Sequence, residues 1–273
     1  MKVDSSAPIG VFDSGVGGLT VMRELLEVLP HEKIIYIGDT AHLPYGDKSS
    51  PEVCQYVRQI IDYFLTRQIK MLVVACNSSV AAADSLLQEV ARFLPVISVV
   101  DPMVEYVATR YGGQEVGLIG TQLTVSSGIY QQKLAKMPNA IILKSLATPR
   151  LVPLIEGLTD DRESLQLVLQ NYLQDPLFKG IKALILGCTH YSLIKDIVQK
   201  FVPDNVAVLD AAQITAETVA HRLAILNLLN LQDDSPTPEF LLSKITPRFC
   251  KVVQEFLGIG GSTVKVCPHK FEL

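Results

Sequence analysis

The chain has 273 residues, of which 48% are hydrophobic, and a formal net charge of −4 from 24 basic and 28 acidic residues. This length suggests one large or two modest domains, either of which can bury a substantial core. The slightly acidic balance, without a run of Lys and Arg, argues against nucleic acid as an obligate partner, because binding to phosphates requires clustered cations.

No stretch approaches the roughly 18 apolar residues of a membrane-spanning helix, and the first residues lack the apolar run of a secretory signal. The cysteines are odd in number, and none forms a CxxC pair; they are Cys54, Cys76, Cys188, Cys250 and Cys267. Free thiols in this pattern are typical of a reducing compartment, so we expect a cytoplasmic protein without a membrane attachment.

Short runs rich in Val, Ile and Leu alternate with longer helical patterns along most of the chain. The predicted strands are residues 8–12, 33–37, 70–75, 96–100, 115–119, 140–143, 183–186 and 206–209. The clearest helices between them are residues 20–29, 51–67 and 79–93. Nearly continuous apolar strands that alternate with helices are typical of parallel sheets covered on both faces, so we predict an α/β fold.

A glycine-rich loop, residues 13–18 (DSGVGG), follows the first strand and precedes a helix. It is not a dinucleotide-binding loop, because the third glycine of G-x-G-x-x-G would fall at Thr20, and the chain contains no P-loop sequence. We therefore expect no nucleotide cofactor, and interpret the glycines as allowing a small anion to approach backbone N–H groups. Asp13 is open to two interpretations, a helix N-cap or a catalytic carboxylate, and capping does not exclude catalysis.

Two later sites carry little information on their own. Pro44, Tyr45 and Gly46 lie in the loop after Asp39, where Pro and Gly are typical of any turn. Glu156 is equally consistent with a side chain that faces solvent.

Two apolar runs stop at a cysteine and continue as a helical pattern: residues 73–78 (VVACNS) and 185–190 (ILGCTH). A helix N-terminus carries a partial positive charge, which favours a thiolate at Cys76 and at Cys188. His190 is close enough in sequence to polarise the second thiol or share its proton. Either cysteine alone would be more typical of a small buried hydrophobic residue, and His190 alone of a surface or capping residue.

The chain repeats itself weakly at an offset of about 110 residues. Residues 9–14 resemble residues 116–121, the two cysteines are 112 positions apart, and residues 96–101 resemble residues 206–210. These matches predict two similar α/β halves with mostly parallel sheets. A (β/α)₈ barrel is the alternative, which we rank second because the halves repeat and the tail continues past eight units.

The C-terminal part of the chain begins with the clearest linker, residues 232–238, which is rich in Asp and Pro. Beyond this linker, residues 247–257 are predicted to form a helix and residues 263–266 a short strand.

Five polar clusters are expected at the carboxyl ends of the strands, where open parallel sheets bind ligands. They are residues 13–14, 44–46, 76–78, 121 and 188–190. The segments around them contain no Lys or Arg, so backbone N–H groups, hydroxyls and amides would bind a carboxylate. Such a neutral site suits a zwitterion.

A pair of separate thiols suits the inversion of a carbon centre, because one base removes a proton from one face and a second group delivers a proton to the other. Redox cycling would favour adjacent thiols. The carbanionic state needs hydrogen-bond donors aimed at its charge, and Ser, Thr and Asn near both cysteines can supply them. No HExxH or Cys/His spacing predicts a metal site.

The motifs resemble those of the cofactor-independent glutamate racemases. The matching segments follow the family order and span most of the chain; they are residues 12–20 (FDSGVGGLT), 38–46 (GDTAHLPYG), 75–78 (ACNS) and 187–191 (GCTHY). The resemblance implies that the protein interconverts L- and D-glutamate without a cofactor and supplies D-glutamate for peptidoglycan. It also implies two three-layer α/β domains, related by a pseudo-two-fold axis, with the active site in the cleft between them. The first domain would be residues 1–98 with the returning segment 210–273, and the second residues 99–209.

The resemblance further implies roles for individual residues. Cys76 would take the proton from D-glutamate and Cys188 from L-glutamate, assisted by Asp13 and His190 respectively, with Glu156 near the site. The residues implied to hold the substrate are Asp13, Ser14, Pro44, Tyr45, Gly46, Asn77, Ser78, Thr121, Thr189 and His190.

Three positions depart from the family pattern. Ser78 stands where Thr is usual and keeps the hydroxyl, Ser192 replaces a usual Pro at a helix start, and Ala211 stands where Ser is frequent.

Two other functions stay open at this point. One is an aspartate racemase or another enzyme of the two-cysteine superfamily, since discrimination by side-chain length depends on pocket geometry. The other is a two-lobed solute-binding protein, against which the paired cysteines count. The sequence leaves open whether the chain forms a homodimer, responds to a cell-wall precursor, or inhibits DNA gyrase as some family members do.

Overall fold

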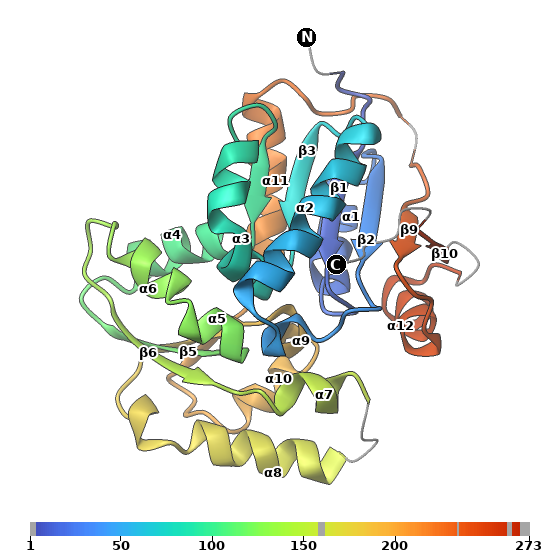
Figure 1. The fold of residues 1–273 in the computed structure, drawn as a ribbon. Coiled ribbons are helices and arrows are strands. Elements are labelled where there is room, and N and C mark those ends of the chain that lie inside the picture. Colours follow the sequence, from blue (N-terminus) through green and yellow to red (C-terminus); the bar gives the residue numbers. More distant parts are fainter. Residues whose placement is uncertain (1–3, 158–161, 234, 261–263, 268–273) are drawn as a thin grey trace.

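The structure is a computed structural model and describes residues 4–157, 162–233, 235–260 and 264–267 (Figure 1). Its strands form two separate sheets, in which all the strand pairs are parallel. The α/β class is therefore confirmed, and the division into two sheets excludes the barrel.

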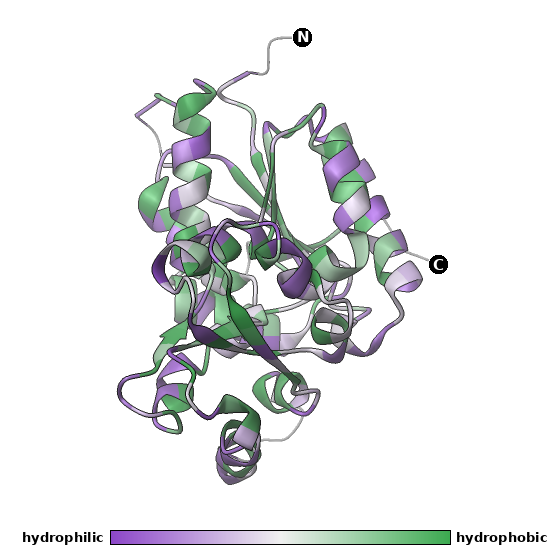
Figure 2. Cartoon of the chain, turned by 90° about the vertical axis from the view of Figure 1, so that its left-hand side faces the viewer, coloured by the Kyte–Doolittle hydropathy of each residue, from purple (hydrophilic) through white to green (hydrophobic). Residues whose placement is uncertain are grey.

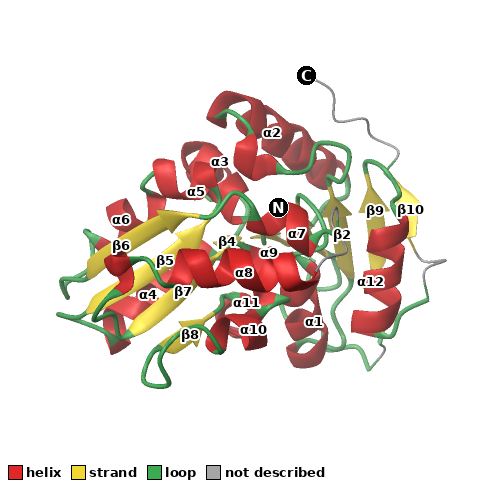
Figure 3. Ribbon diagram, turned by 90° about the horizontal axis from the view of Figure 1, so that it is seen from below, coloured by secondary structure: helices red, strands yellow, loops and turns green. Residues whose placement is uncertain are grey.

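The first sheet has six strands in the order β10-β9-β2-β1-β3-β4. Its strands are β1 (Ile9–Asp13), β2 (Ile34–Gly38), β3 (Met71–Val74), β4 (Val96–Ser98), β9 (Glu239–Leu242) and β10 (Val264–Val266). All residues of β1, β2 and β3 are buried, because helices cover both faces. Figure 3 shows α2 (Ser50–Thr66) and α3 (Asn77–Val90) on one side and α1 (Leu19–Val28) and α12 (Pro247–Leu257) on the other.

The second sheet has four strands in the order β6-β5-β7-β8. Its strands are β5 (Glu115–Gly120), β6 (Ile142–Ala147), β7 (Ala183–Gly187) and β8 (Ala207–Leu209). The remaining helices are α4 (Val100–Arg110), α5 (Gln122–Ser126), α6 (Ile129–Leu134), α7 (Leu151–Ile155), α8 (Arg162–Leu173), α9 (Thr189–Ser192), α10 (Lys195–Gln199) and α11 (Ala212–Ile225), with short 3₁₀ turns η1 (Tyr45–Asp47) and η2 (Pro176–Phe178).

Local sequence signals explain the helix ends. The Ser49 side chain caps α2 by accepting a hydrogen bond from the N–H of Glu52. Thr246 caps α12 in the same way, and Gly258 ends that helix in a left-handed conformation with φ of 68°. In Figure 2 the outer helices carry alternating hydrophobic and hydrophilic segments, as expected for helices that bury one face.

The chain leaves the first sheet after Ser98 and returns to it after Leu209, so the C-terminal strands β9 and β10 complete the sheet that β1 begins. This path agrees with the predicted return of the C-terminal segment. The domain boundaries themselves stay a prediction.

Two expectations about strands were wrong. The strand expected at residues 140–143 is β6, which runs from Ile142 to Ala147; it lies at the sheet edge and is half-exposed, so its residues lack a continuous apolar run. β9 was not predicted at all, because its four residues directly follow the Pro-rich linker. The predicted strand start at Thr263 lies outside the described residues.

Among the residues that the structure describes, none of the helices has the length and apolar character to cross a membrane.

Candidate active site

The carboxyl ends of strands from both sheets meet at one small cavity. Cys76 follows β3 at the start of α3, and Cys188 follows β7 at the start of α9. The lining residues come from both halves of the chain and are Ser14, Leu43, Pro44, Tyr45, Gly46, Cys76, Asn77, Ser78, Thr121, Val152, Cys188, Thr189 and His190. The structure therefore brings the two thiols to one space.

The cavity is tight, with a volume of about 10 Å³. That is about the space that one water molecule requires. An amino acid therefore fits only after the lining residues move apart.

Cys76 occupies the N-cap position of α3 and is buried. Its thiol donates toward Ser14 Oγ at 3.8 Å. Burial, and next the negative charge of Asp13, raise the pKa of Cys76 to about 12, although the neighbouring hydroxyl and backbone N–H of Ser79 act in the opposite direction. The helix start thus favours the thiolate in direction, as expected, but burial and Asp13 outweigh it, and the net change is a raised pKa.

Cys188 lies beside a buried histidine and carboxylate. His190 Nδ1 is 3.7 Å from Cys188 Sγ, and His190 Nε2 is 2.5 Å from Glu156 Oε1. Burial alone would lower the pKa of His190, but the hydrogen bonds to Cys188 and Glu156 raise that pKa well above its usual value. Burial would raise the pKa of Glu156, yet its bond to His190 holds it below the usual value. An imidazolium–carboxylate pair therefore stands behind Cys188.

This pair resolves two readings that the sequence left open. The His190 and Glu156 side chains are 3% and 9% exposed, so neither residue is a surface residue. Helix α9 has only four residues, so the charge next to Cys188 comes mainly from His190.

Asp13 connects the two halves. Its carboxylate accepts hydrogen bonds from the N–H of Gly15 at 2.8 Å and from the hydroxyl of Thr189 at 2.9 Å. It is not a helix N-cap, because α1 begins after Gly18 without a side-chain cap. Burial raises the pKa of Asp13, against the opposing effect of His190. Asp13 lies below the cavity wall rather than in it.

Gly17 allows the glycine-rich loop to pack against the other half. A Cβ at this position would lie 2.5 Å from Thr189 Oγ1 and 2.6 Å from the backbone nitrogen of His190. The absence of a side chain thus serves the packing of the loop on the segment that holds Cys188.

Hydrogen bonds fix the polar lining. Ser78 and Thr121 join the two halves through their hydroxyls at 2.9 Å, and Tyr130 donates to Asn77 Oδ1 at 2.8 Å. Tyr45 donates to Asp39 at 2.5 Å. No Lys or Arg is among the described lining residues, as the sequence indicated.

Sequence reasoning missed several residues of the site. Leu43 and Val152 line the cavity, but apolar residues carry no chemical signal. Asp39 binds both Tyr45 and His42, and its buried position was not visible in the sequence.

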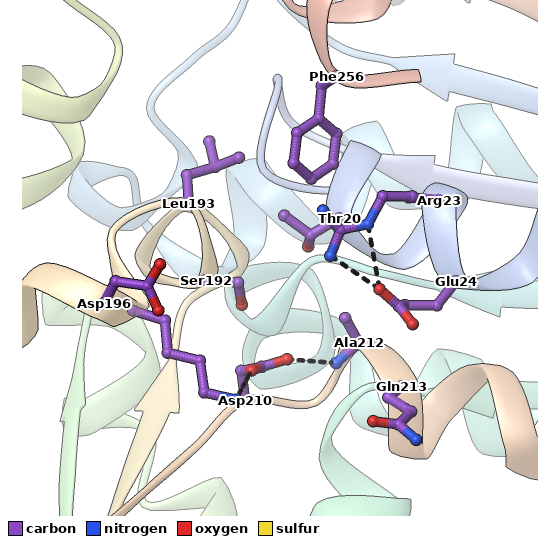
Figure 4. Close-up of a pocket in the computed structure, with 11 residues that line it drawn as sticks. Thr20, Arg23, Glu24, Ser192, Leu193, Asp196, Asp210, Ala212, Gln213 and Phe256 are labelled. Carbon is purple, nitrogen blue, oxygen red and sulfur yellow. Dashed lines mark hydrogen bonds and ion pairs between the residues drawn. The ribbon is translucent and has the colours of Figure 1, made fainter. Parts of the chain in front are cut away.

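A second cavity lies outside this site, between α1, the α9–α10 segment and the start of α11 (Figure 4). It has a volume of about 340 Å³, and four of its charged side chains are paired: Arg23 with Glu24 at 2.8 Å and Lys195 with Asp210 at 2.6 Å. It contains neither thiol, so it offers no acid/base pair of this kind.

Among the described residues, no group of three or more His, Cys, Asp and Glu side chains is placed to hold a metal ion. Two parallel-sheet halves, each with a buried thiol at one shared cavity, define a class of two-thiol α/β enzymes.

Comparison with known proteins names the family within that class. The profile of the Asp/Glu/Hydantoin racemase family matches residues 9–219. The chain belongs to this family and is an amino-acid racemase.

Individual relatives agree with this assignment. The chain is 38% identical to the glutamate racemase of Neisseria meningitidis over 257 residues, which cover 94% of this chain and 95% of that protein. Its structure is similar to that of the glutamate racemase isoform RacE1 from Bacillus anthracis, with a TM-score of 0.88 and 32% identity over 96% of this chain and 97% of that one. The glutamate racemase of Francisella tularensis in complex with D-glutamate gives a TM-score of 0.87 and 33% identity over the same shares. The resemblance inferred from the motifs is thus confirmed.

Proposed function

We propose that this protein interconverts L- and D-glutamate by a two-base reaction in which Cys76 and Cys188 act on opposite faces of Cα. One observation carries the proposal: two buried thiols from different halves line one cavity. The choice of glutamate is supported by the similarity to glutamate racemases over more than nine-tenths of the chain.

In the proposed reaction from L-glutamate, the Cys188 thiolate removes the α-proton and the Cys76 thiol delivers its proton to the other face. The Cα–H bond to one face breaks as a new S–H bond forms at Cys188, and the S–H bond of Cys76 breaks as the new Cα–H bond forms. The reverse reaction exchanges these roles. In this proposal Asn77, Ser78 and the first N–H groups of α3, which border the cavity, donate hydrogen bonds to the substrate as negative charge develops.

The surroundings of the thiols support this starting state. The raised pKa of Cys76 keeps it protonated at neutral pH, so it can act as an acid. The His190 imidazolium beside Cys188 stabilises negative charge on that sulfur. Asp13 and Glu156 act through their neighbours, since each hydrogen-bonds a group that lines the cavity.

Supply of D-glutamate for peptidoglycan is the cellular role that we propose with this activity. It would place the enzyme in the cytoplasm, where free thiols stay reduced. The partner is then a small molecule, the amino acid itself, and no cofactor takes part.

An assay in D₂O tests the proposal. The protein is incubated without added cofactor with L-glutamate or, in parallel, L-aspartate, while optical rotation and deuterium at Cα are followed. We expect rotation change and exchange with glutamate. Neither change with glutamate, or faster turnover of aspartate, would overturn the substrate assignment.

Single substitutions test the two-base assignment. Cys76→Ser and Cys188→Ser should each lower kcat at least about a hundredfold, since each removes a general acid/base. Cys54→Ser is the matched control, because Cys54 lies outside the cavity. Wild-type kcat in either active-site variant would refute the assignment.

A further inference from the structure

Ser79 has a buried hydroxyl without a hydrogen-bond partner. It lies in the first turn of α3, three residues after Cys76, and is 0% exposed. Among the described residues its Oγ makes no hydrogen bond, a property that it shares with one other buried hydroxyl, that of Thr215 in α11. Such a group destabilises the fold unless an acceptor becomes available at some stage.

The candidate acceptor for the Ser79 hydroxyl is the sulfur of Cys76. Cys76 is the N-cap residue of α3 and Ser79 is the third helical residue, whose N–H an N-cap side chain can reach; as a thiol, Cys76 makes no such capping hydrogen bond. Hydrogen bonding from both the backbone and the side chain of Ser79 favours the ionised form of Cys76 and lowers its pKa, against burial and Asp13.

The strength of this interaction depends on the protonation state of the sulfur. As a thiol, Cys76 Sγ donates toward Ser14, and a neutral sulfur is a weak acceptor. As a thiolate it becomes a strong acceptor of charge-assisted hydrogen bonds. The unpaired hydroxyl of Ser79 therefore gains a good partner only when Cys76 ionises.

No cation takes this role at Cys76. The titratable groups that face it are Asp13 at the end of β1, Cys188 of the other half, Tyr36 of β2 and Tyr45 of η1. All of them are neutral or negative, so none supplies what His190 supplies to Cys188. A neutral hydrogen-bond donor is therefore the remaining way to stabilise a Cys76 thiolate. Unlike a cation, such a donor would not form an ion pair with the Asp13 carboxylate instead.

We propose that Ser79 is a positioning residue for racemisation, whose hydroxyl and backbone N–H donate to the Cys76 sulfur when it is ionised and so make it a competent base. The inference rests on the proposed two-base function. Ser79 would stabilise negative charge on the Cys76 sulfur, as His190 does on the Cys188 sulfur.

The first test measures thiol ionisation and needs no turnover. Ser79→Ala removes only the hydroxyl, and Thr215→Val is the matched control, because it removes the other unpaired buried hydroxyl far from the thiols. The rate of alkylation by iodoacetamide is followed at each cysteine by peptide mass spectrometry from pH 7 to 10.

We expect Ser79→Ala to slow alkylation of Cys76 about tenfold at each pH, which corresponds to a rise of about one pKa unit. Cys188 in the same molecules, and both thiols in Thr215→Val, should react as in the wild type. Unchanged alkylation of Cys76 would overturn the proposal.

Stability distinguishes this role from a structural one. Removal of an unpaired buried hydroxyl should leave the midpoint of urea unfolding of Ser79→Ala unchanged or raise it. A lower midpoint would show that the hydroxyl supports the fold and would count against the proposal.

The second test uses isotope effects. Since two enantiomers have equal free energies, kcat/KM must fall equally in both directions and does not reveal which thiol is impaired. The primary kinetic isotope effect of α-deuterated substrate does reveal it. In Ser79→Ala this isotope effect should rise with D-glutamate, because removal of its proton by Cys76 becomes more rate-limiting, and should fall with L-glutamate. Equal changes for both enantiomers would overturn the role of Ser79 while leaving racemisation intact, whereas failure of the two-base function would appear as full activity of Cys76→Ser.

Discussion

Glu156 and His190 form a closely coupled pair of residues beside Cys188, at 2.5 Å. Both belong to the half of the chain that carries Cys188. The carboxylate keeps the imidazole charged and turns its other nitrogen toward the sulfur, so the charge on Glu156 is felt at Cys188 without direct contact.

Glu156→Gln tests this relay. The neutral amide should lower the pKa of His190, so the alkaline limb of the kcat profile moves to lower pH, and kcat at pH 8 should fall about tenfold or more, as one pKa unit or more is lost. Glu52→Gln, which removes an exposed carboxylate paired with Lys48, is the control and should behave as the wild type. An unmoved alkaline limb in Glu156→Gln would exclude the relay.

The same pair predicts how stability varies with pH. The pKa of Glu156 is lowered by folding, so its contribution is present above about pH 4.5 and is lost as the pH falls through the lowered value. The pKa of His190 is raised, so its contribution is complete below about pH 6.5 and is lost as the pH rises through the raised value. The difference in urea unfolding free energy between wild type and Glu156→Gln should therefore be greatest between about pH 4.5 and 6.5; a difference independent of pH would contradict this linkage.

Residues with a chemical signature were within reach of the sequence. Cys76 and Cys188 were found because each ends an apolar run, and both line the cavity. The donor role that we infer for Ser79 was out of reach, since it depends on an unpaired hydroxyl and on the burial of the neighbouring sulfur. The roles inferred for the substrate-binding residues stay predictions.

At the scale of elements, α12 reaches across the boundary between the halves. Arg248 Nη2 donates to the carbonyl of Ile155, the last residue of α7, at 3.1 Å. Arg248 and Glu156 border a hollow of about 270 Å³, which shares Leu43, Pro44 and Val152 with the thiol cavity. α12 therefore ties down the helix that leads into Glu156.

Arg248→Ala should loosen this contact. We expect KM for glutamate to rise about twofold to fivefold, as for the loss of one exposed hydrogen bond, with kcat little changed because no reacting group is removed. Lys251→Ala on the same helix is the control, since Lys251 pairs only with Glu255 at 3.8 Å. An unaltered KM in Arg248→Ala would show that the contact does not affect closure.

Element prediction succeeded where burial is two-sided. The bounds of β1, β3 and β7 were predicted within a residue or two, because a strand buried on both faces appears in the sequence as a continuous apolar run. The short helices α5, α7, α9 and α10 have four or five residues and no full period, so tertiary packing rather than sequence pattern defines them.

The molecule as a whole consists of two halves that meet along one seam. Besides the contacts at Asp13 and Ser78, Lys133 of α6 pairs with Asp84 of α3 at 3.0 Å and with Asp101 of α4 at 2.6 Å. The repeat in the sequence predicted two halves, but it contains no information on how they face each other. That arrangement depends on contacts between residues far apart in the chain.

The small cavity predicts that the site opens and closes, and that bound substrate makes opening rarer. Hydrogen exchange of backbone amides in η1 and α5, which meet across the seam, should slow when D-glutamate is present at saturation, because the ligand favours the closed form. Peptides of α8, on the outside of the second half, should exchange at the same rate with and without ligand (Figure 1). Equal exchange in η1 and α5 with and without ligand would show that closure is independent of substrate.

The small volume of the cavity also determines the fate of isotopes. In the proposed two-base reaction, one turnover leaves the donor sulfur ionised and the acceptor sulfur protonated, and a space that holds about one water molecule would give the transferred proton little opportunity to leave. Restoration of the starting protonation state therefore coincides with the opening that releases product. A product molecule would then carry at Cα a hydrogen that came from solvent by way of a sulfur, whereas a substrate molecule released unconverted would keep its original hydrogen. In D₂O, deuterium would therefore accumulate at Cα of the product enantiomer before it appears in the remaining substrate.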